Sequence, residues 1–175
     1  MVYIHSTPYY DIFKTFIFSE KEYLMEIERK YLIQASSIPF DYTQYPCRHI
    51  EQGYLSTEPV VRIRKDNDDY FLTYKSKGFL SREEYNLPLT KDSYDHLKSK
   101  IDGRLIQKLR YVIPLDSSLS IEMDFFQGDL SPLILAEVEF PNETLANTFQ
   151  PPNWFGEDVT FSPKYHNSVL SLHNI

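Results

Sequence analysis

The segment from Met25 to Leu32 places three charged side chains on one face of a predicted strand. Successive side chains of a strand alternate between its two faces. Glu26, Glu28 and Lys30 therefore point the same way, within a segment that is otherwise typical of a buried strand. Buried charges persist only where they are paired or bind a metal. Any fold built on this strand has to supply partners for these three groups.

Composition limits the class of protein. A length of 175 residues predicts one domain with a sizeable core. The fractions of hydrophobic residues (42%) and charged residues (25%) are those of a globular protein, and the 15% of aromatic residues favours strands. A net charge of -7 argues against nucleic-acid binding over the whole surface, although it leaves room for a local basic cavity.

Other features bear on location and chain organisation. The single cysteine, Cys47, excludes an internal disulfide and a cysteine-based zinc site. No segment approaches the roughly 18 apolar residues of a membrane span, and no secretory signal is evident. We therefore expect a cytoplasmic protein that binds no membrane. Residues 1–22 are aromatic-rich without a clear period, so they either form an extension packed on the domain or precede its natural start; residues 23–175 are predicted to be one domain.

Hydrophobic periodicity predicts a strand-rich chain with few helices. Eight segments alternate as strands do: 24–33, 49–56, 59–65, 70–77, 81–87, 104–113, 119–126 and 132–140. Three segments are predicted to be helical: 91–101, 142–149 and 164–173. Thr90 and Asn142 are suitable N-caps for the first two helices. Gly53, inside the second strand, indicates that backbone or ligand approaches closely there.

The polar faces of these strands carry charges that are sorted by strand. Basic pairs occur at Arg62/Arg64, Lys75/Lys77 and Lys108/Arg110, and acidic pairs at Glu26/Glu28, Glu122/Asp124 and Glu137/Glu139. In the simpler arrangement all of them face water. However, the acidic pairs at 26/28 and 137/139 lie in apolar surroundings. A closed barrel resolves this conflict, because charged faces then line the interior and apolar faces carry peripheral helices. The predicted fold class is α+β, with an eight-stranded antiparallel barrel.

Such an interior has a chemical meaning. Converging Arg and Lys side chains form an anion site, and arginine suits forked contacts to phosphate oxygens. Carboxylates in the same cavity repel a polyphosphate unless they hold divalent cations, and carboxylate oxygens suit Mg²⁺ or Mn²⁺. A basic clamp beside an acidic metal site is suited to phosphoryl transfer.

The run Glu26-Ile27-Glu28-Arg29-Lys30 matches the ExExK signature of the CYTH superfamily, the triphosphate tunnel metalloenzymes. Further matching motifs follow in family order: Gln52–Leu55, Arg62–Arg64, Phe71–Gly78, Ser81–Tyr85, Lys108–Tyr111, Glu122–Phe125, Leu135–Phe140 and Trp154–Gly156. The chain resembles the short, single-domain bacterial members, which are chiefly inorganic triphosphatases.

The resemblance implies an eight-stranded antiparallel tunnel that binds a small triphosphate. The protein is expected to be a monomer or a homodimer. It implies Mg²⁺ or Mn²⁺ ligands at Glu26, Glu28, Glu137 and Glu139. It implies phosphate contacts from Lys30, Arg62, Arg64, Lys75, Lys77, Arg82, Lys108 and Arg110. Within the site, the residues implied to take part in catalysis are Lys30, Arg62, Lys75 and Tyr54, and those implied to support it are Glu84, Glu122 and Asp124.

Two departures and several alternatives stay open. Asn86 stands where many members have a carboxylate, and Ser162-Pro163-Lys164-Tyr165 departs from the usual Asp-x-Arg-Tyr. The leading hypothesis is metal-dependent hydrolysis of inorganic triphosphate. Alternatives within the fold are a class IV-type adenylate cyclase and a thiamine triphosphatase; a different class is a non-catalytic polyphosphate- or nucleotide-binding module. The five histidines show no ligand spacing and are expected to be ordinary surface or packing residues.

Overall fold

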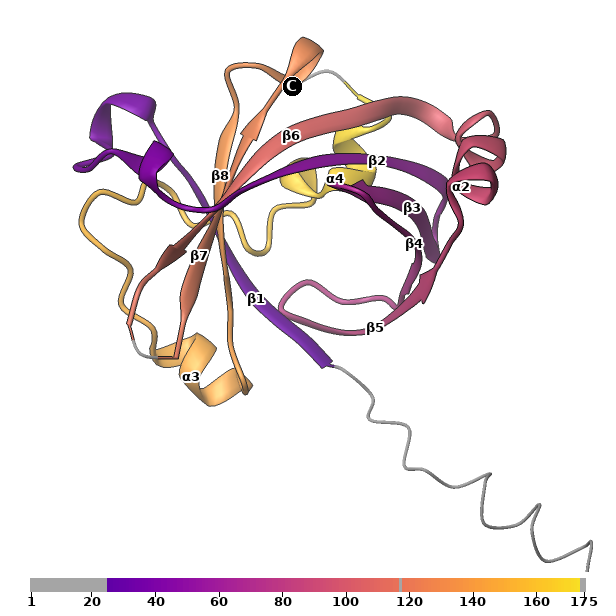
Figure 1. Cartoon of the computed structure of the whole chain (residues 1–175). Coiled ribbons are helices and arrows are strands. Elements are labelled where there is room, and N and C mark those ends of the chain that lie inside the picture. Colours follow the sequence, from indigo (N-terminus) through magenta and orange to yellow (C-terminus); the bar gives the residue numbers. More distant parts are fainter. Residues whose placement is uncertain (1–24, 117, 174–175) are drawn as a thin grey trace, which may run out of the picture.

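The computed structural model describes residues 25–116 and 118–173 (Figure 1). Within them, eight strands close into an antiparallel barrel in the order β1-β5-β4-β3-β2-β6-β7-β8, which confirms the predicted fold. The strands are β1 (Met25–Leu32), β2 (Cys47–Thr57), β3 (Val60–Asp66), β4 (Asp69–Lys75), β5 (Ser81–Pro88), β6 (Asp102–Pro114), β7 (Ser120–Phe126) and β8 (Ile134–Glu139). The helical elements are η1 (Ala35–Ser37), η2 (Tyr42–Gln44), α2 (Lys91–Lys98), η3 (Gly128–Leu130), α3 (Glu143–Thr148), η4 (Pro163–Tyr165) and α4 (Asn167–Leu170).

Strand β1 closes the barrel. Its first residues pair with β5, with Glu26 opposite Arg82, and its later residues pair with β8, with Glu28 opposite Glu139. The other strands follow as the run β2–β5 and the run β6–β8, whose members are joined to their neighbours in sequence order. The chain therefore places two acidic pairs, from its first and last strands, side by side.

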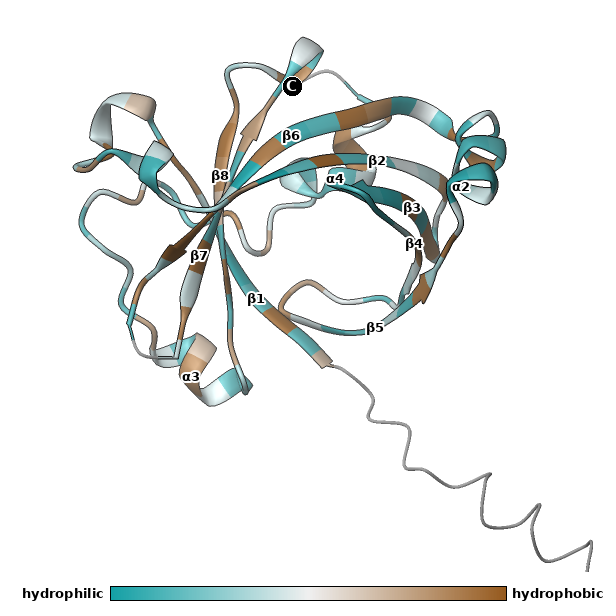
Figure 2. Cartoon of the chain, in the orientation of Figure 1, coloured by the Kyte–Doolittle hydropathy of each residue, from teal (hydrophilic) through white to brown (hydrophobic). Residues whose placement is uncertain are grey.

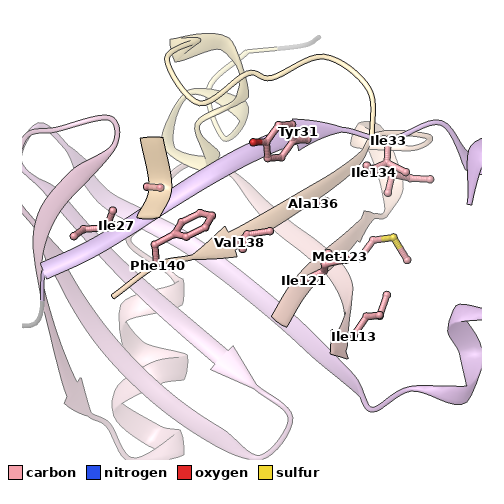
Figure 3. Close-up of a cluster of buried hydrophobic side chains, with 11 residues drawn as sticks. Ile27, Tyr31, Ile33, Ile113, Ile121, Met123, Ile134, Ala136, Val138 and Phe140 are labelled. Atoms are coloured by element: carbon pink, nitrogen blue, oxygen red, sulfur yellow. The ribbon is translucent and has the colours of Figure 1, made fainter. Parts of the chain in front are cut away.

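An apolar layer covers the outside of β1, β7 and β8 (Figure 3). It is built from the outward-facing alternate residues of these strands together with Ala146 of α3. The strand residues include Ile27, Tyr31, Ile121, Met123, Ala136 and Val138. Figure 2 shows hydrophilic and hydrophobic bands following one another along β1 and β6. Since the apolar faces point outward here, the charged faces of the same strands point into the barrel.

The interior is not charged throughout. Tyr54, Ile106, Phe126 and Leu135 pack into a second buried cluster with Leu170 of α4. In β6, β7 and β8, each of these apolar residues lies on the same face as a charged one two positions away, for example Ile106 beside Lys108. The apolar cluster therefore fills one part of the barrel interior and leaves the charged part to form the cavity.

Helix α2 packs on the outside of β2–β4 and is anchored by buried groups. Thr90 caps it, as predicted, by accepting a hydrogen bond from the Ser93 backbone N–H. Tyr94 is 1% exposed and donates to Glu51 of β2. Just beyond the helix, Ile101 packs on Gly53, where a Cβ would lie 2.7 Å from Ile101 Cγ2. A close approach was predicted at this glycine for backbone or ligand; the structure shows a close approach, but the side chain of Ile101 makes it.

The predicted helix over residues 164–173 is wrong in extent. The chain instead forms the 3-10 turn η4, followed by the single-turn helix α4. His166, between them, has extended backbone angles (φ -72°, ψ 132°), which interrupt helical hydrogen bonding. The interruption places residues 166–168 against the cavity.

The prediction for residues 1–22 lies outside the described residues. Among residues 25–116 and 118–173, no helix is long and apolar enough to span a membrane.

Candidate active site

Charged side chains from every strand of the barrel line an internal cavity of about 330 Å³. Seven are basic: Lys30, Arg48, Arg62, Arg64, Lys75, Arg82 and Arg110. Six are acidic: Glu26, Glu28, Glu84, Glu122, Glu137 and Glu139. The alternation that places them follows from strand geometry, and barrel closure brings their separate strands together.

Three of the acidic residues form a cluster that is suited to a cation. Glu26, Glu28 and Glu139 each offer a carboxylate oxygen, and these oxygens lie within 4.8 Å of one another. Glu28 and Glu139 are directly opposed across the β1–β8 pair, and Glu26 lies on the same face of β1. Three closely spaced carboxylate oxygens are the ligand type that Mg²⁺ and Mn²⁺ take in proteins.

At two of the three carboxylates, Glu28 and Glu139, burial and neighbouring negative charge outweigh the nearby positive charge and raise the pKa. Burial, together with the negative charges of Glu122, Glu26, Glu28 and Glu137, raises the pKa of Glu139 to about 7. Burial also raises the pKa of Glu28, and nearby Glu137 and Glu26 add to this effect against the charge of Lys30. A divalent cation would offset this mutual repulsion, so the residues present fit such an ion.

Glu26 differs from the other two carboxylates. It accepts hydrogen bonds from Lys75 Nζ (2.6 and 2.7 Å) and from Arg82 Nε (2.7 Å). Burial raises the pKa of Glu26, but the charges of Lys75 and Arg82 outweigh it and hold the pKa well below the ordinary value. Glu26 thus links the acidic cluster to two of the predicted phosphate-binding residues.

Glu137 was predicted to be a metal ligand, but it is not part of this three-residue cluster. Lys30 Nζ lies 2.9 Å from its Oε1, and Arg110 Nη2 donates to its Oε2 at 2.6 Å. Burial raises the pKa of Glu137, yet Lys30 and Arg110 bring it well below the ordinary value. Its placement is that of a partner for two basic groups of the cavity.

The side chains of Arg62 and Arg64, on β3, have donors that are not used. Arg62 is 3% exposed, and among the described residues its Nε and Nη2 find no hydrogen-bond acceptor. Its nearest carboxylate oxygen, on Glu84, lies 3.6 Å away, which is too far for a hydrogen bond. Arg64 Nε is likewise without an acceptor in the described part of the chain. Burial and the charges of Arg62 and Arg110 lower the pKa of Arg64 to about 10.

Because these guanidinium donors lie on the cavity wall, they are available to an acceptor that enters the cavity, and an anionic acceptor gains most from them. In the strand order, β3 stands opposite β8, which carries Glu139. Arginines with free donors on one wall thus face the acidic cluster on the other. This arrangement can hold an anion between Arg62/Arg64 and a cation bound by the cluster.

Basic residues on β6 are neutralised by β7. Arg110 makes a forked contact to Asp124, with Nε–Oδ1 at 2.7 Å and Nη2–Oδ2 at 2.6 Å, and also pairs with Glu122. Lys108 pairs with Asp124, and both side chains are fully buried. Burial, and then the charge of Arg110, lower the pKa of Lys108 to about 8. Neither Lys108 nor Asp124 lines the cavity, so the structure does not bring the predicted phosphate ligand Lys108 to the site.

Lys77 also lies outside the cavity. Strand β4 ends at Lys75, so the alternation that predicted Lys77 on the same face stops before reaching it. Its side chain is 81% exposed and pairs with Glu58. By contrast, Lys30, Arg82 and Tyr54 line the cavity as predicted.

Sequence reasoning missed several cavity residues. Strand β2 was predicted to start at residue 49 but starts at Cys47, so it includes one more inward-facing residue, Arg48. The Arg48 side chain donates to Asp66 at 2.9 Å. His166, Asn167 and Ser168 reach the cavity from the interrupted C-terminal segment. Burial, Lys30 and Arg82 lower the pKa of His166 to about 4. The period-two pattern could have found Arg48, but no periodic signal marks His166.

Comparison with known proteins identifies the family. The sequence model of the CYTH domain family matches residues 24–125. The chain belongs to the CYTH domain family. An inorganic triphosphatase of Nitrosomonas europaea is 40% identical over 152 residues, which cover 85% of this chain and 98% of that protein.

Two more relatives agree with this assignment. An inorganic triphosphatase of Acetivibrio thermocellus is 36% identical over 124 residues, covering 68% of this chain and 77% of the relative. A crystal structure of an inorganic triphosphatase is 37% identical, with a TM-score of 0.64 over 85% of this chain and 95% of that one. The CYTH family is thus supported by sequence and by fold.

Proposed function

We propose that this protein hydrolyses inorganic triphosphate to orthophosphate and diphosphate, with Mg²⁺ or Mn²⁺ bound at Glu26, Glu28 and Glu139. The observation that carries the proposal is the opposition of the free donors of Arg62 and Arg64 to a cluster of three carboxylates, of which Glu139 contacts no basic side chain among the described residues. The two curated relatives named as inorganic triphosphatases support the same substrate.

The lining of the cavity favours an inorganic chain over a nucleotide. Its uncharged apolar contributors are Met25, Tyr54 and Val60, whereas thirteen lining residues are Lys, Arg or Glu. A base or a thiazolium ring gains most from apolar and aromatic walls. A triphosphate instead gains from many charge-assisted hydrogen bonds, which arginine provides with matched geometry.

The protein groups have distinct tasks in this proposal. Arg62 and Arg64 bind phosphate oxygens through donors that no carboxylate of the described chain satisfies. Lys75 and Arg82, already tied to Glu26, hold positive charge next to the acidic cluster. A divalent cation in the cluster would neutralise phosphate oxygens and lower the pKa of a bound water.

The reaction needs a water and no further co-reactant. The water oxygen bonds to a terminal phosphorus, the bridging P–O bond breaks, and the bridging oxygen leaves with the diphosphate. The proton lost by the water passes to a phosphate oxygen of the products or to solvent. Charge accumulates on that oxygen and on the terminal phosphate during the transfer, so fixed cations such as Lys30, Arg62 and Lys75 lower the barrier by stabilising it.

A substrate and metal panel tests the proposal. Phosphate release from inorganic triphosphate, ATP and thiamine triphosphate is measured with Mg²⁺, with Mn²⁺ and with chelator, and cyclic AMP is measured in the ATP reaction. We expect the highest kcat/KM for inorganic triphosphate and no turnover in chelator. Formation of cyclic AMP would indicate an adenylate cyclase, and a preference for thiamine triphosphate would indicate a thiamine triphosphatase; either would contradict the proposal. Tight binding without turnover would indicate a non-catalytic binding module.

A single substitution tests the cation site. Glu28→Gln removes a ligand charge at constant size, so we expect metal-dependent turnover to fall by at least about 100-fold while the circular dichroism spectrum is unchanged. Glu157→Gln, the same change at an exposed carboxylate, is the matched control and should retain full activity. Unchanged activity of Glu28→Gln would contradict the assignment of the ligands.

A further inference from the structure

Gln52, on β2, lies between two residues of the cavity without lining it. It is fully buried, with 0% of its surface exposed. Its Nε2 donates to Tyr54 Oη at 3.0 Å, and its Oε1 accepts from Arg64 Nη2 at 3.4 Å. Gln52 and Arg64 are directly opposed across the β2–β3 pair, so strand register fixes this geometry.

The donors and acceptors determine how the hydroxyl of Tyr54 is oriented. A guanidinium can only donate, so Arg64 requires the oxygen end of the Gln52 amide. The NH₂ end must then face Tyr54, and the Tyr54 oxygen accepts from it. The side chain of Arg62 also hydrogen-bonds this hydroxyl and, as a guanidinium, can only donate to its oxygen. The proton of the Tyr54 hydroxyl is therefore not used by Gln52 and is available to an acceptor in the cavity, which Tyr54 lines. Burial raises the pKa of Tyr54 and keeps that proton in place.

We propose that Gln52 is a positioning residue that makes Tyr54 a hydrogen-bond donor to a phosphate oxygen and holds Arg64 toward the same anion. The identity of the anion rests on the proposed function. Gln52 touches no substrate; it acts through Tyr54 and Arg64. One amide thus sets the polarity of two neighbouring contacts of the anion site.

Two substitutions separate this role from simple packing. Gln52→Glu keeps the shape and the acceptor for Arg64, but it replaces the donor with an acceptor, so the Tyr54 proton turns toward the new carboxylate. Gln52→Met keeps a similar length and removes both hydrogen bonds. Tyr54→Phe removes the hydroxyl itself. Thermal unfolding and circular dichroism identify any variant that fails to fold, in which case the other Gln52 variant is used.

The deciding measurement is a double-mutant cycle of kcat/KM for inorganic triphosphate. In the wild-type background we expect Tyr54→Phe to lower kcat/KM by roughly 10- to 100-fold, the range for a hydrogen bond to a charged acceptor. In the Gln52→Glu and Gln52→Met backgrounds the same change should cost less than about 3-fold, because the hydroxyl is no longer directed to the substrate. An equal cost of Tyr54→Phe in all three backgrounds would overturn the proposal.

A second readout does not depend on turnover. The ¹³Cζ resonance of Tyr54, assigned by its loss in Tyr54→Phe, reports on the hydrogen bonds of the phenol oxygen. We expect Gln52→Glu to shift it, since the oxygen changes from acceptor to donor, and an unshifted resonance would overturn the proposal. If the wild-type protein hydrolyses no triphosphate, the proposed function fails, and this resonance still decides the role of Gln52.

Discussion

Two walls of the same barrel carry similar basic residues in opposite states. On β6, Arg110 contacts Asp124, Glu122 and Glu137, and Lys108 is buried against Asp124. On β3, Arg62 and Arg64 have buried donors without acceptors among the described residues. The difference shows that the number of basic residues facing a cavity does not measure its capacity for an anion. The cations that lack carboxylates determine that capacity.

The energetics of the two walls differ in the same way. A buried charge that keeps its partners costs little further free energy, whereas removing one partner leaves an uncompensated charge. The buried ion pairs of Lys108 and Arg110 with β7 should therefore govern stability. Arg62 and Arg64 on β3 should govern turnover. Two substitutions test this division directly, and two more compare it with the acidic cluster and with a surface lysine.

Arg62→Ala should have the largest effect on activity. We expect kcat/KM for inorganic triphosphate to fall by about 100- to 1000-fold, as for the loss of one preorganised donor to developing charge. The midpoint of thermal unfolding should stay the same or rise, because the substitution relieves repulsion with Arg64. Arg62→Lys keeps the charge but not the planar fork, so its kcat/KM should lie between the values of the wild type and of Arg62→Ala. A large loss of stability with little loss of activity would reverse the assignment of this wall.

Asp124→Asn should have the largest effect on stability. It leaves Lys108 and Arg110 buried beside one fewer carboxylate, so we expect the free energy of unfolding to drop by about 3–5 kcal/mol. The measurement is denaturant unfolding at neutral pH, with the exposed turn residue substitution Asp68→Asn as the matched control. Equal stability of the two variants would mean that the buried ion pairs between β6 and β7 do not govern the stability of the fold.

Glu139→Gln should produce a smaller, pH-dependent effect. The pKa of Glu139 is raised from an ordinary 4.5 to about 7 in the folded chain, so between these values the folded state binds the proton that the unfolded state has lost. The contribution of Glu139 to the free energy of unfolding is therefore fully present below pH 4.5 and is lost as the pH rises to about 7. In chelator, the variant should gain stability over wild type across this window and keep the gain above it. A constant difference at all pH values would contradict the raised pKa.

Lys77→Ala should have the smallest effect. Its side chain is 81% exposed and pairs only with Glu58 at the surface in the described structure. We expect KM and kcat for inorganic triphosphate to change by less than about 2-fold, as for an exposed ion pair. A rise in KM comparable to that of Arg62→Ala would restore the role that the resemblance implied for Lys77.

The sequence predicted the barrel because alternation fixes which residues share a face. The pairs 26/28, 62/64 and 137/139 therefore pointed inward as predicted. Alternation contains no information on partners across strands. Lys75 and Lys108 each begin a basic pair, yet Lys75 lines the cavity and Lys108 is buried against Asp124. That outcome depends on register and on closure of the barrel.

Segments without a period were the least predictable. The C-terminal helix was predicted too long because composition does not reveal the extended backbone of His166. The same interruption brings His166 and Asn167 to the cavity. Arg48 was missed for a different reason, since it occupies the end of a strand, where boundaries are least certain from sequence.

The closure of the barrel by β1 has a consequence for folding. The pairing of Glu28 with Glu139 joins residues 111 positions apart (139 minus 28), and contacts of such separation form slowly because the intervening chain must first be ordered. The acidic cluster draws on both of these strands, so it exists only once the ring is complete. A cation bound there would link the first strand to the last, because its ligands come from both. Its binding would favour the closed ring by mass action, and the rate of opening at this seam would respond to metal concentration.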